Sequence, residues 1–246
     1  MFETQNPTFI QRLKGNKEQT FKCSGTPLNP FDLHVLGYCI ANSSTLWSVN
    51  LNNCGLTYER MRMLFFVKDG KAFDHITNFN VSDKTITAST ASLLGMILKE
   101  NNTLKKLDLH HCGLQPEGLE DVIKGVQVNS KLETLVLSYN TIDSTRASCL
   151  GMMLKENNTL KKLDFEECEL QPEGLDKVIK GVQVNIMLET LDLLGYTIDD
   201  ETASCLETQQ VVVIVLRLVI VEEYQVRLKK TPESKHNMVP RLTTGY

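Results

Sequence analysis

Histidine and cysteine are the side chains through which this chain would bind a metal ion or act as a nucleophile. The sequence holds five histidines and seven cysteines, and His110 and His111 are adjacent. Two neighbouring imidazoles can share a zinc ion, but neighbours on a strand point to opposite faces and both reach solvent only at a strand's end. No CxxC, HExxH or GxSxG pattern occurs. We therefore expect no metal, no cofactor and no catalytic site.

Three of the cysteines, Cys54, Cys112 and Cys168, follow similar apolar patterns. A small thiol or polar side chain at such a position can satisfy the backbone groups of a buried loop, so we assign these cysteines a structural role. The segment Met1 to Phe21 has no apolar stretch of the kind a secretory signal needs. We expect reduced thiols and a cytoplasmic protein.

An internal repeat supplies the elements that would position these residues. The pattern Leu-x-x-Leu-x-Leu-x-x-Cys-x-Leu begins at Leu104 and fits the leucine-rich-repeat consensus at every fixed position. It begins again at Leu132, Leu160 and Leu188, at intervals of 28 residues. Tyr196 takes the place of the cysteine in the last of these copies.

Further copies extend the repeat in both directions. Leu46 begins a good copy, and Ile76 begins a weaker one after a longer connection. Counting back from Leu46 finds a truncated first repeat at Phe21, and counting forward finds a last repeat from Leu216, with Val219 in its strand. We expect about seven repeats plus the truncated first one. The expected segments are a tail over residues 1–19, one solenoid over 20–226 and a second tail over 227–246.

Each repeat combines two hydrophobic periods. Leu107 and Leu109 alternate with polar residues, which predicts a short strand with one face in the core. An apolar helical face follows, formed in one repeat by Leu119, Val122, Ile123 and Val126. One strand and one helix cannot bury such faces alone, whereas stacked copies can. We predict an α/β solenoid of the horseshoe type, with parallel strands on the concave face and helices on the convex face.

The 28-residue repeats resemble those of the ribonuclease-inhibitor class, which includes the repeat domains of NOD-like receptors. The segments Leu28–Ile40 and Leu46–Leu56 resemble the opening of a NOD-like-receptor repeat domain in particular. This resemblance implies a non-enzymatic, cytoplasmic module of innate immunity that binds a protein ligand. The chain lacks the GxxxxGK[ST] sequence of a nucleotide-binding domain, and Lys68–Lys71 makes no such loop. The resemblance therefore implies ligand binding without nucleotide-driven oligomerisation.

Two alternative functions stay open. The chain would act as a regulator or inhibitor of another enzyme if it resembled the leucine-rich GTPase-activating proteins or the ribonuclease inhibitors in function. It would have no independent role if it were a truncated receptor fragment. A native transcript that continued upstream into a nucleotide-binding region would separate the receptor hypothesis from the others.

A duplication points to the expected binding surface. Residues 91–146 and 147–202 are near copies, yet several outward strand positions differ between them. The pairs that differ are His110/Glu166, His111/Glu167, Val136/Asp192, Ser138/Leu194 and Tyr139/Gly195. The helical run 122–129, which we expect to be exposed, is unchanged, so the divergence favours diversification of a binding surface over simple drift. We expect a protein partner to contact Lys106, Asp108, His110, His111, Val136, Ser138, Tyr139, Lys162, Asp164, Glu166, Glu167, Asp192 and Leu194.

The charge balance restricts the kind of partner. The formal net charge is -4 and the pI is about 5.8, which argues against nucleic acid. The carboxylates expected on the concave face are Asp83, Asp108, Asp164, Glu166, Glu167, Asp192, Glu222 and Glu223, against Lys106 and Lys162. An acidic surface predicts a basic or mixed-charge protein partner. The most apolar run, Val211–Val221, is far shorter than the roughly 20 residues that span a bilayer, so we expect no membrane segment.

The last repeat departs from the pattern. Its expected outward residues Leu218 and Ile220 are apolar, and β-branched residues replace the polar residues that end the equivalent helix. The sequence 229–246 that follows is polar and lacks periodicity. We predict a poorly covered last strand that promotes self-association.

Overall fold

The computed structural model describes residues 19–25, 27–67, 73–196, 198, 206 and 212–214. All of them belong to one compact unit, Met1–Leu216, and the remaining residues from Arg217 form a second unit. Several expectations lie outside the described residues: the strand residues Leu218 and Ile220, the carboxylates Glu222 and Glu223, and both tails.

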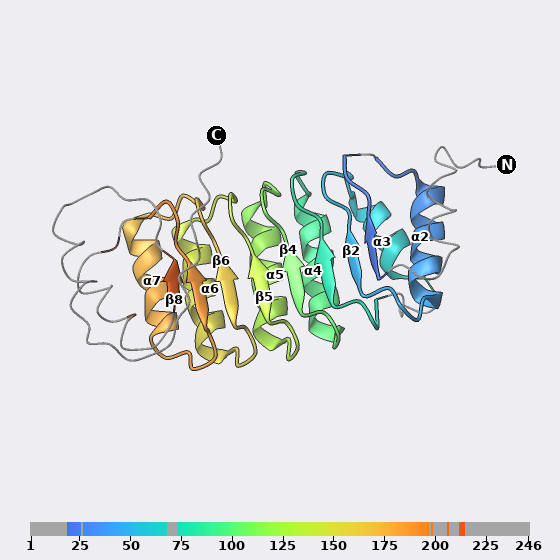
Figure 1. Ribbon diagram of the computed structural model, residues 1–246. Coiled ribbons are helices and arrows are strands. Elements are labelled where there is room, and N and C mark those ends of the chain that lie inside the picture. The colour runs from blue at the N-terminus through green and yellow to red at the C-terminus, as the bar shows by residue number, and fades with distance from the viewer. Residues whose placement is uncertain are drawn as a thin grey trace, which may run out of the picture. The chain divides into compact units, whose positions relative to one another are not determined.

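The described residues form eight strands in one parallel sheet whose order follows the sequence. The strands are β1 (Thr20–Lys22), β2 (Ser48–Asn50), β3 (Asn78–Asn80), β4 (Lys106–Asp108), β5 (Thr134–Val136), β6 (Lys162–Asp164), β7 (Thr190–Asp192) and β8 (Val212–Ile214). Figure 1 shows them side by side in chain order. This confirms the α/β solenoid predicted from the repeat.

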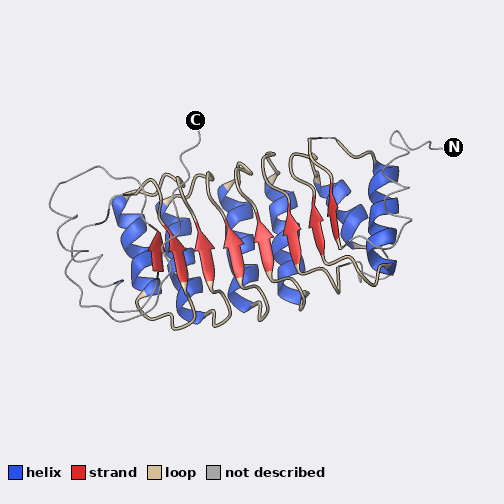
Figure 2. Cartoon of the chain, viewed as in Figure 1, coloured by secondary structure: helices blue, strands red, loops and turns tan. Residues whose placement is uncertain are grey.

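Helices connect the strands and all lie on one side of the sheet (Figure 2). They are α2 (Pro30–Asn42), α3 (Tyr58–Phe65), α4 (Ala88–Glu100), α5 (Pro116–Val128), α6 (Ser144–Glu156) and α7 (Pro172–Val182). Four helices have a side-chain N-cap: Asn29 caps α2, Thr57 caps α3, Thr87 caps α4 and Asp143 caps α6. Helices α5 and α7 instead begin at a proline, whose missing N–H is not needed in a first turn. None of the described helices is long and apolar enough to cross a membrane.

The predicted register is confirmed through seven strands. Phe21 of the truncated first repeat pairs with Val49, and Val49 pairs with Phe79 of the weaker copy. Leu107 and Leu135 are opposite each other in β4 and β5. These residues point into the core and are at most 1% exposed.

The register predicted for the last strand is wrong, although the strand lies within the apolar run Val211–Val221. We expected Val219 opposite Leu191 of β7, but β8 begins at Val212 and places Val213 opposite Leu191. The run 211–215 is apolar and mostly β-branched, and such residues favour an extended chain. The strand therefore forms six residues before the position that the 28-residue period gives.

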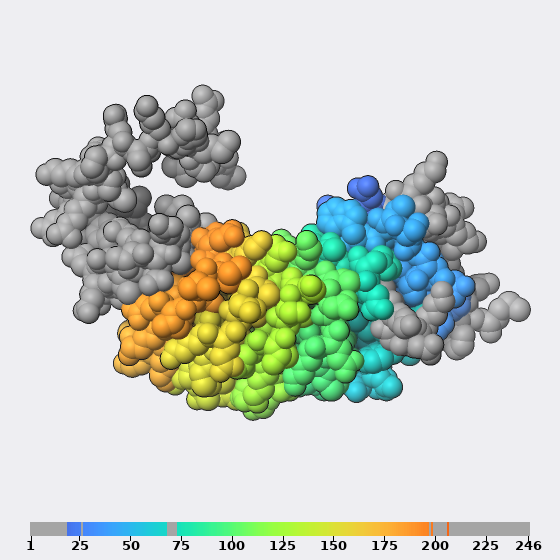
Figure 3. Space-filling model, turned by 90° about the horizontal axis from the view of Figure 1, so that it is seen from below, coloured from blue at the N-terminus to red at the C-terminus, as the bar shows by residue number. Residues whose placement is uncertain are grey.

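The core lies between the sheet and the helices. The fixed leucines of the repeat are buried in every described copy, and so is the predicted helical face from Leu119 to Val126. Figure 3 shows the repeats as successive colour bands, each in contact with its neighbours. No single repeat encloses a core, so burial depends on stacking.

Glycines set how closely the helices of the duplicated block approach. A Cβ atom on Gly151 of α6 would lie 2.3 Å from the carbonyl oxygen of Lys177 in α7, and one on Gly181 would lie 2.4 Å from the oxygen of Gly151. Gly95 and Gly125 repeat this arrangement between α4 and α5. Because even a methyl group would not fit, the two helices of each pair are in backbone contact.

Buried asparagines at the helix ends join each repeat to the one before it. The side-chain amide of Asn157 donates to the carbonyl oxygen atoms of Val126 and Asn129, at 2.8 and 3.3 Å. Its oxygen accepts the N–H groups of Thr159 and Leu160, at 3.0 and 2.8 Å. The asparagines at 129 and 185 make the equivalent bonds, and we call the three the asparagine ladder.

The recurring cysteines have the structural role that the sequence predicts. The thiols of Cys54, Cys112 and Cys168 each donate to a carbonyl oxygen of the preceding repeat, at 3.1, 3.4 and 3.2 Å. The alternate repeats use other residues: the Asn140 amide accepts the Cys112 N–H and donates to the Leu109 carbonyl oxygen in the preceding repeat, and the Tyr196 hydroxyl accepts the Cys168 N–H at 2.8 Å. These side chains satisfy backbone groups that would otherwise be buried unpaired.

Candidate functional site

The candidate site is the face of the sheet that points away from the helices, which we call the open sheet face. Residues on either side of each buried strand leucine point to it. Lys106, Asp108, Val136, Lys162, Asp164 and Asp192 all lie there, in register across β4 to β7. The structure thus brings the strand residues predicted to bind a partner onto one surface.

A second set of predicted residues follows each strand. His110, Ser138, Glu166 and Leu194 come two residues after it, and His111, Tyr139, Glu167 and Gly195 come next. Members of this last group have positive φ, from 49° at His111 to 92° at Gly195. The left-handed region costs a residue with a side chain about 1–2 kcal/mol, so His111, Tyr139 and Glu167 keep strained backbones where glycine would be relaxed.

Side chains from four successive repeats form a chain of contacts beyond the ends of β3 to β6. The Asp83 carboxylate lies 3.6 Å from His110 Nε2 and 3.7 Å from His111 Nδ1. The His110 ring packs edge-on against the ring of Tyr139, with 5.0 Å between centroids. The Tyr139 hydroxyl donates to Glu166 Oε1 at 3.1 Å. These contacts hold the Tyr139 side chain, which is 46% exposed, near the middle of the open sheet face.

Two of the predicted binding residues are less accessible than expected. Ser138 is 2% exposed and Val136 is 9% exposed. The Ser138 hydroxyl lies 3.1 Å from His110 Nδ1, so the larger imidazole covers it. Val136 is flanked in register by Asp108 and Asp164. The expectation that both are solvated is therefore wrong, because their side chains are shorter than those around them.

The copies of the block differ at the aromatic position for a steric reason. Gly195 is the counterpart of Tyr139, and a Cβ atom built on it would lie 2.6 Å from the Glu167 carboxyl carbon. The Glu167 side chain therefore occupies the space over Gly195. In this structure only the first copy presents an aromatic ring there, and a side chain at 195 would require the Glu167 carboxylate to move.

The unchanged run 122–129 does not favour diversification of a binding surface over simple drift. We expected this run to be exposed, but Val122, Ile123, Val126 and Asn129 are at most 4% exposed. Buried residues are retained through packing whatever the function. The concentration of differences on the open sheet face is therefore explained in part by exposure.

Carboxylates gather over β6 and β7. Burial raises the pKa of Glu166, and the nearby carboxylates of Asp192, Asp164 and Glu167 raise it further, against the lowering effect of the Tyr139 hydrogen bond. Burial also raises the pKa of Asp192. This part of the face therefore carries negative charge that a cation would stabilise. Among the described residues, no group of three potential metal-ligating side chains comes together.

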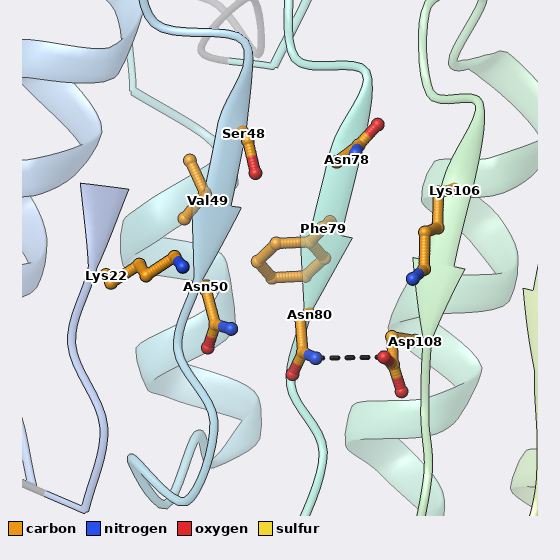
Figure 4. Close-up of a pocket in the computed structure, with 9 residues that line it drawn as sticks. All are labelled: Lys22, Ser48, Val49, Asn50, Asn78, Phe79, Asn80, Lys106 and Asp108. Carbon is orange, nitrogen blue, oxygen red and sulfur yellow. Dashed lines mark hydrogen bonds between the residues drawn. The ribbon is translucent and has the colours of Figure 1, made fainter. Parts of the chain in front are cut away.

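A polar hollow over β1 to β4 escaped the sequence reasoning (Figure 4). Its lining includes Lys22, Ser48, Asn50, Asn78 and Asn80 together with the predicted Lys106 and Asp108. The alternation in the copies from Leu46 and Ile76 already placed the serine and the asparagines outward. Serine and asparagine are neutral, so neither the charge balance nor the aromatic residues of the sequence pointed to them.

Comparison with known proteins agrees with the repeat geometry. A family model described as "Leucine Rich repeat" matches residues 100–122, 128–151 and 156–178. The matched segments are leucine-rich repeats, and they resemble those of the ribonuclease-inhibitor class. The matched segments contain β4, β5 and β6, each with the first part of the helix that follows it.

Curated relatives carry the same leucine-rich repeats. Leucine-rich repeat-containing protein 45 of Gallus gallus is 25% identical over 50% of this chain and 19% of its own length. Ribonuclease inhibitor of Sus scrofa is 28% identical over 65% of this chain and 35% of its length. NACHT, LRR and PYD domains-containing protein 6 of Rattus norvegicus is 28% identical over 79% of this chain and 22% of its own length. The chain thus spans between a fifth and a third of the length of these relatives.

Proposed function

We propose that this leucine-rich-repeat chain is a protein-binding module that uses its open sheet face, the surface expected to be concave, to hold a protein partner. The observation that carries the proposal is the exposed Tyr139 ring, held between His110 and Glu166 on a strained backbone. Asn53, Asp83, His111 and Glu167 share the positive φ at the same turn position, so the conformation belongs to the repeat and the exposed ring itself supports the proposal. Rigid, half-exposed aromatic residues are the usual anchors of protein interfaces.

The resemblance to NOD-like receptors gives this proposal its biological setting. The match to NACHT, LRR and PYD domains-containing protein 6 covers 79% of the chain. We therefore assign the module to the cytoplasm and to ligand sensing in innate immunity. The carboxylates around Glu166 and Asp192 favour a partner that places basic residues over β6 and β7.

Site-specific photo-crosslinking in cells tests where the partner binds. Benzoylphenylalanine in place of Tyr139 should form adducts with a defined partner when irradiated. The matched control is the same residue in place of Tyr38, which is 56% exposed on helix α2. Adducts that form equally at both positions, or only at Tyr38, would show that the open sheet face is not the binding surface.

Inhibition of a basic enzyme is a second candidate function, favoured by the match to ribonuclease inhibitor. The acidic residues Asp164 and Asp192 would contact the enzyme's basic surface. A molar excess of the chain should then lower the activity of a basic ribonuclease, and Asp164→Lys with Asp192→Lys should restore it. Full ribonuclease activity in the presence of the unaltered chain rules this candidate out.

A further inference from the structure

The hollow over β1 to β4 has a volume of about 120 Å³ and is crossed by two rows of side chains. The rows are set by strand register. One row runs through Ser48, Asn78 and Lys106, and the other through Lys22, Asn50, Asn80 and Asp108. Neighbouring members of a row are about 4.8 Å apart, the distance between strands. The hollow therefore presents polar groups as a regular array.

Hydrogen bonds fix how two of the amides face. Asn50 Oδ1 accepts the backbone N–H of Asn52 at 3.0 Å. Asn80 Oδ1 accepts the backbone N–H and the hydroxyl group of Ser82, at 3.0 and 2.9 Å. A backbone N–H can only donate, so the accepting atom must be the oxygen. Each amide consequently directs its NH₂ group, and not its oxygen, away from the turn.

Donors exceed acceptors in the hollow. The one carboxylate in its lining, Asp108, accepts the NH₂ group of Asn80 at 2.9 Å. The NH₂ group of Asn50 has no acceptor among the described residues, and neither Lys22 nor Lys106 forms an ion pair with them. Figure 4 shows the Lys22 side chain extending toward Asn50. The site therefore offers two ammonium groups and at least one amide donor with few acceptors to satisfy them.

We propose that this hollow binds the carboxylate of an aspartate or glutamate side chain on the protein partner. A carboxylate carries acceptors only, and its charge complements the two lysines. The inference rests on the proposed function, because it names the chemistry by which one part of the open sheet face recognises its partner.

The same row of side chains gives the partner a direction. From β1 to β7 the row through Lys22 continues as Asp108, Val136, Asp164 and Asp192. Its charge therefore changes from positive at β1 to negative at β6 and β7. A partner with an acidic patch and a basic patch fits in one orientation, and the reversed orientation would place like charges together. The basic partner expected from sequence describes only one end of this face.

A peptide titration of the full chain tests the carboxylate site. Hexaglutamate is added to ¹⁵N-labelled protein, and the side-chain NH₂ signals of Asn50 and Asn78 are followed. Both signals should shift on titration. Lys22→Gln with Lys106→Gln should weaken binding about two- to thirtyfold, the range expected when two exposed charge pairs are lost. The matched control, Lys131→Gln with Lys155→Gln, removes the same charge at exposed positions away from the hollow and should leave the affinity near that of the unaltered chain.

Three outcomes would overturn the inference. They are the absence of shifts at Asn50 and Asn78, equal weakening by both double variants, and tighter binding of an oligothymidylate of the same charge. Failure here is distinguishable from failure of the proposed function. If hexaglutamate does not bind while position 139 still cross-links to a partner, the binding module stands and the carboxylate site falls.

Discussion

The Tyr139 hydroxyl group donates a 3.1 Å hydrogen bond to Glu166 Oε1 and so joins two successive repeats on the open sheet face. The backbone N–H of Tyr139 also donates to the carbonyl oxygen of Glu166, at 2.9 Å. Glu166 thus accepts from the same residue twice, while it stands among the carboxylates of Asp164, Glu167 and Asp192. Its bond to tyrosine opposes the repulsion from these neighbours.

Replacing the charge at Glu166 should stabilise the fold near neutral pH. Glu166→Gln keeps an oxygen that accepts from Tyr139 and removes the repulsion. The pKa of Glu166 is raised in the folded state, so folding costs free energy above that pKa and the cost disappears as pH falls below the unfolded value. The melting temperature of the variant should therefore exceed that of the unaltered chain at pH 7, with no difference near pH 3.5. An equal gain at both pH values would contradict the electrostatic origin.

The asparagine ladder should contribute strongly to stability. Asn157→Ala leaves the N–H groups of Thr159 and Leu160 without their acceptor and removes one donor from each of the carbonyl oxygens of Val126 and Asn129. We expect a loss of about 2–3 kcal/mol in the free energy of unfolding, measured by urea denaturation. The adjacent Asn158 is exposed, and Asn158→Ala provides the control, with an expected change below about 0.5 kcal/mol. Similar losses for both variants would show that the ladder is not the cause.

A strained turn offers a stabilising substitution. Glu169 has a φ of 57°, and the equivalent residues in other copies are Gly55 and Gly113. Glu169→Gly should raise the free energy of unfolding by about 0.5–1 kcal/mol, because glycine adopts this conformation without steric cost. Glu169→Ala removes the same charge and keeps the strain, so it should give no gain. If alanine stabilised as much as glycine, charge and not backbone conformation would be responsible.

Thiol reactivity should separate the cysteines by burial. Burial raises the pKa of Cys112 to about 12 and that of Cys168 to about 12. The thiolate is the reactive form, so both should resist iodoacetamide in the native protein at pH 8 and react after unfolding. Cys149 is half-buried and should react first. Mass spectrometry of the alkylated peptides over time gives the three rates, and equal native rates would contradict the assigned burial.

Sequence predicted the fold well because leucine positions and strand alternation are fixed by stacking. Leu107, predicted to be in the core, is fully buried, and Phe21 was correctly placed in a truncated first repeat. The prediction failed at β8, where a local run of β-branched residues from Val211 outweighed the period. A period identifies which residues can stack, but local conformational preference decides where an imperfect last copy forms its strand.

The site was predicted less completely than the fold. Register placed Lys106 and Asp164 on the correct face, because alternation alone determines the side of a strand. Accessibility depends on the heights of neighbouring side chains, so the burial of Ser138 beneath His110 could not be inferred from alternation. The donor-rich hollow depends on which atom of each asparagine is already engaged, as at Asn50, and only the folded turns show this.

The ladder asparagines give the array a direction of growth. Each amide, as at Asn157, donates to carbonyl oxygens of the repeat that the ribosome made earlier. A newly emerged repeat therefore finds its acceptors already synthesised, and a chain interrupted after any repeat leaves carbonyls that water can reach. Loss of an early repeat is more costly, because the asparagine NH₂ group of the next repeat is buried and loses its carbonyl acceptors. The molecule is thus suited to assembly during translation, one repeat at a time from the N-terminal side.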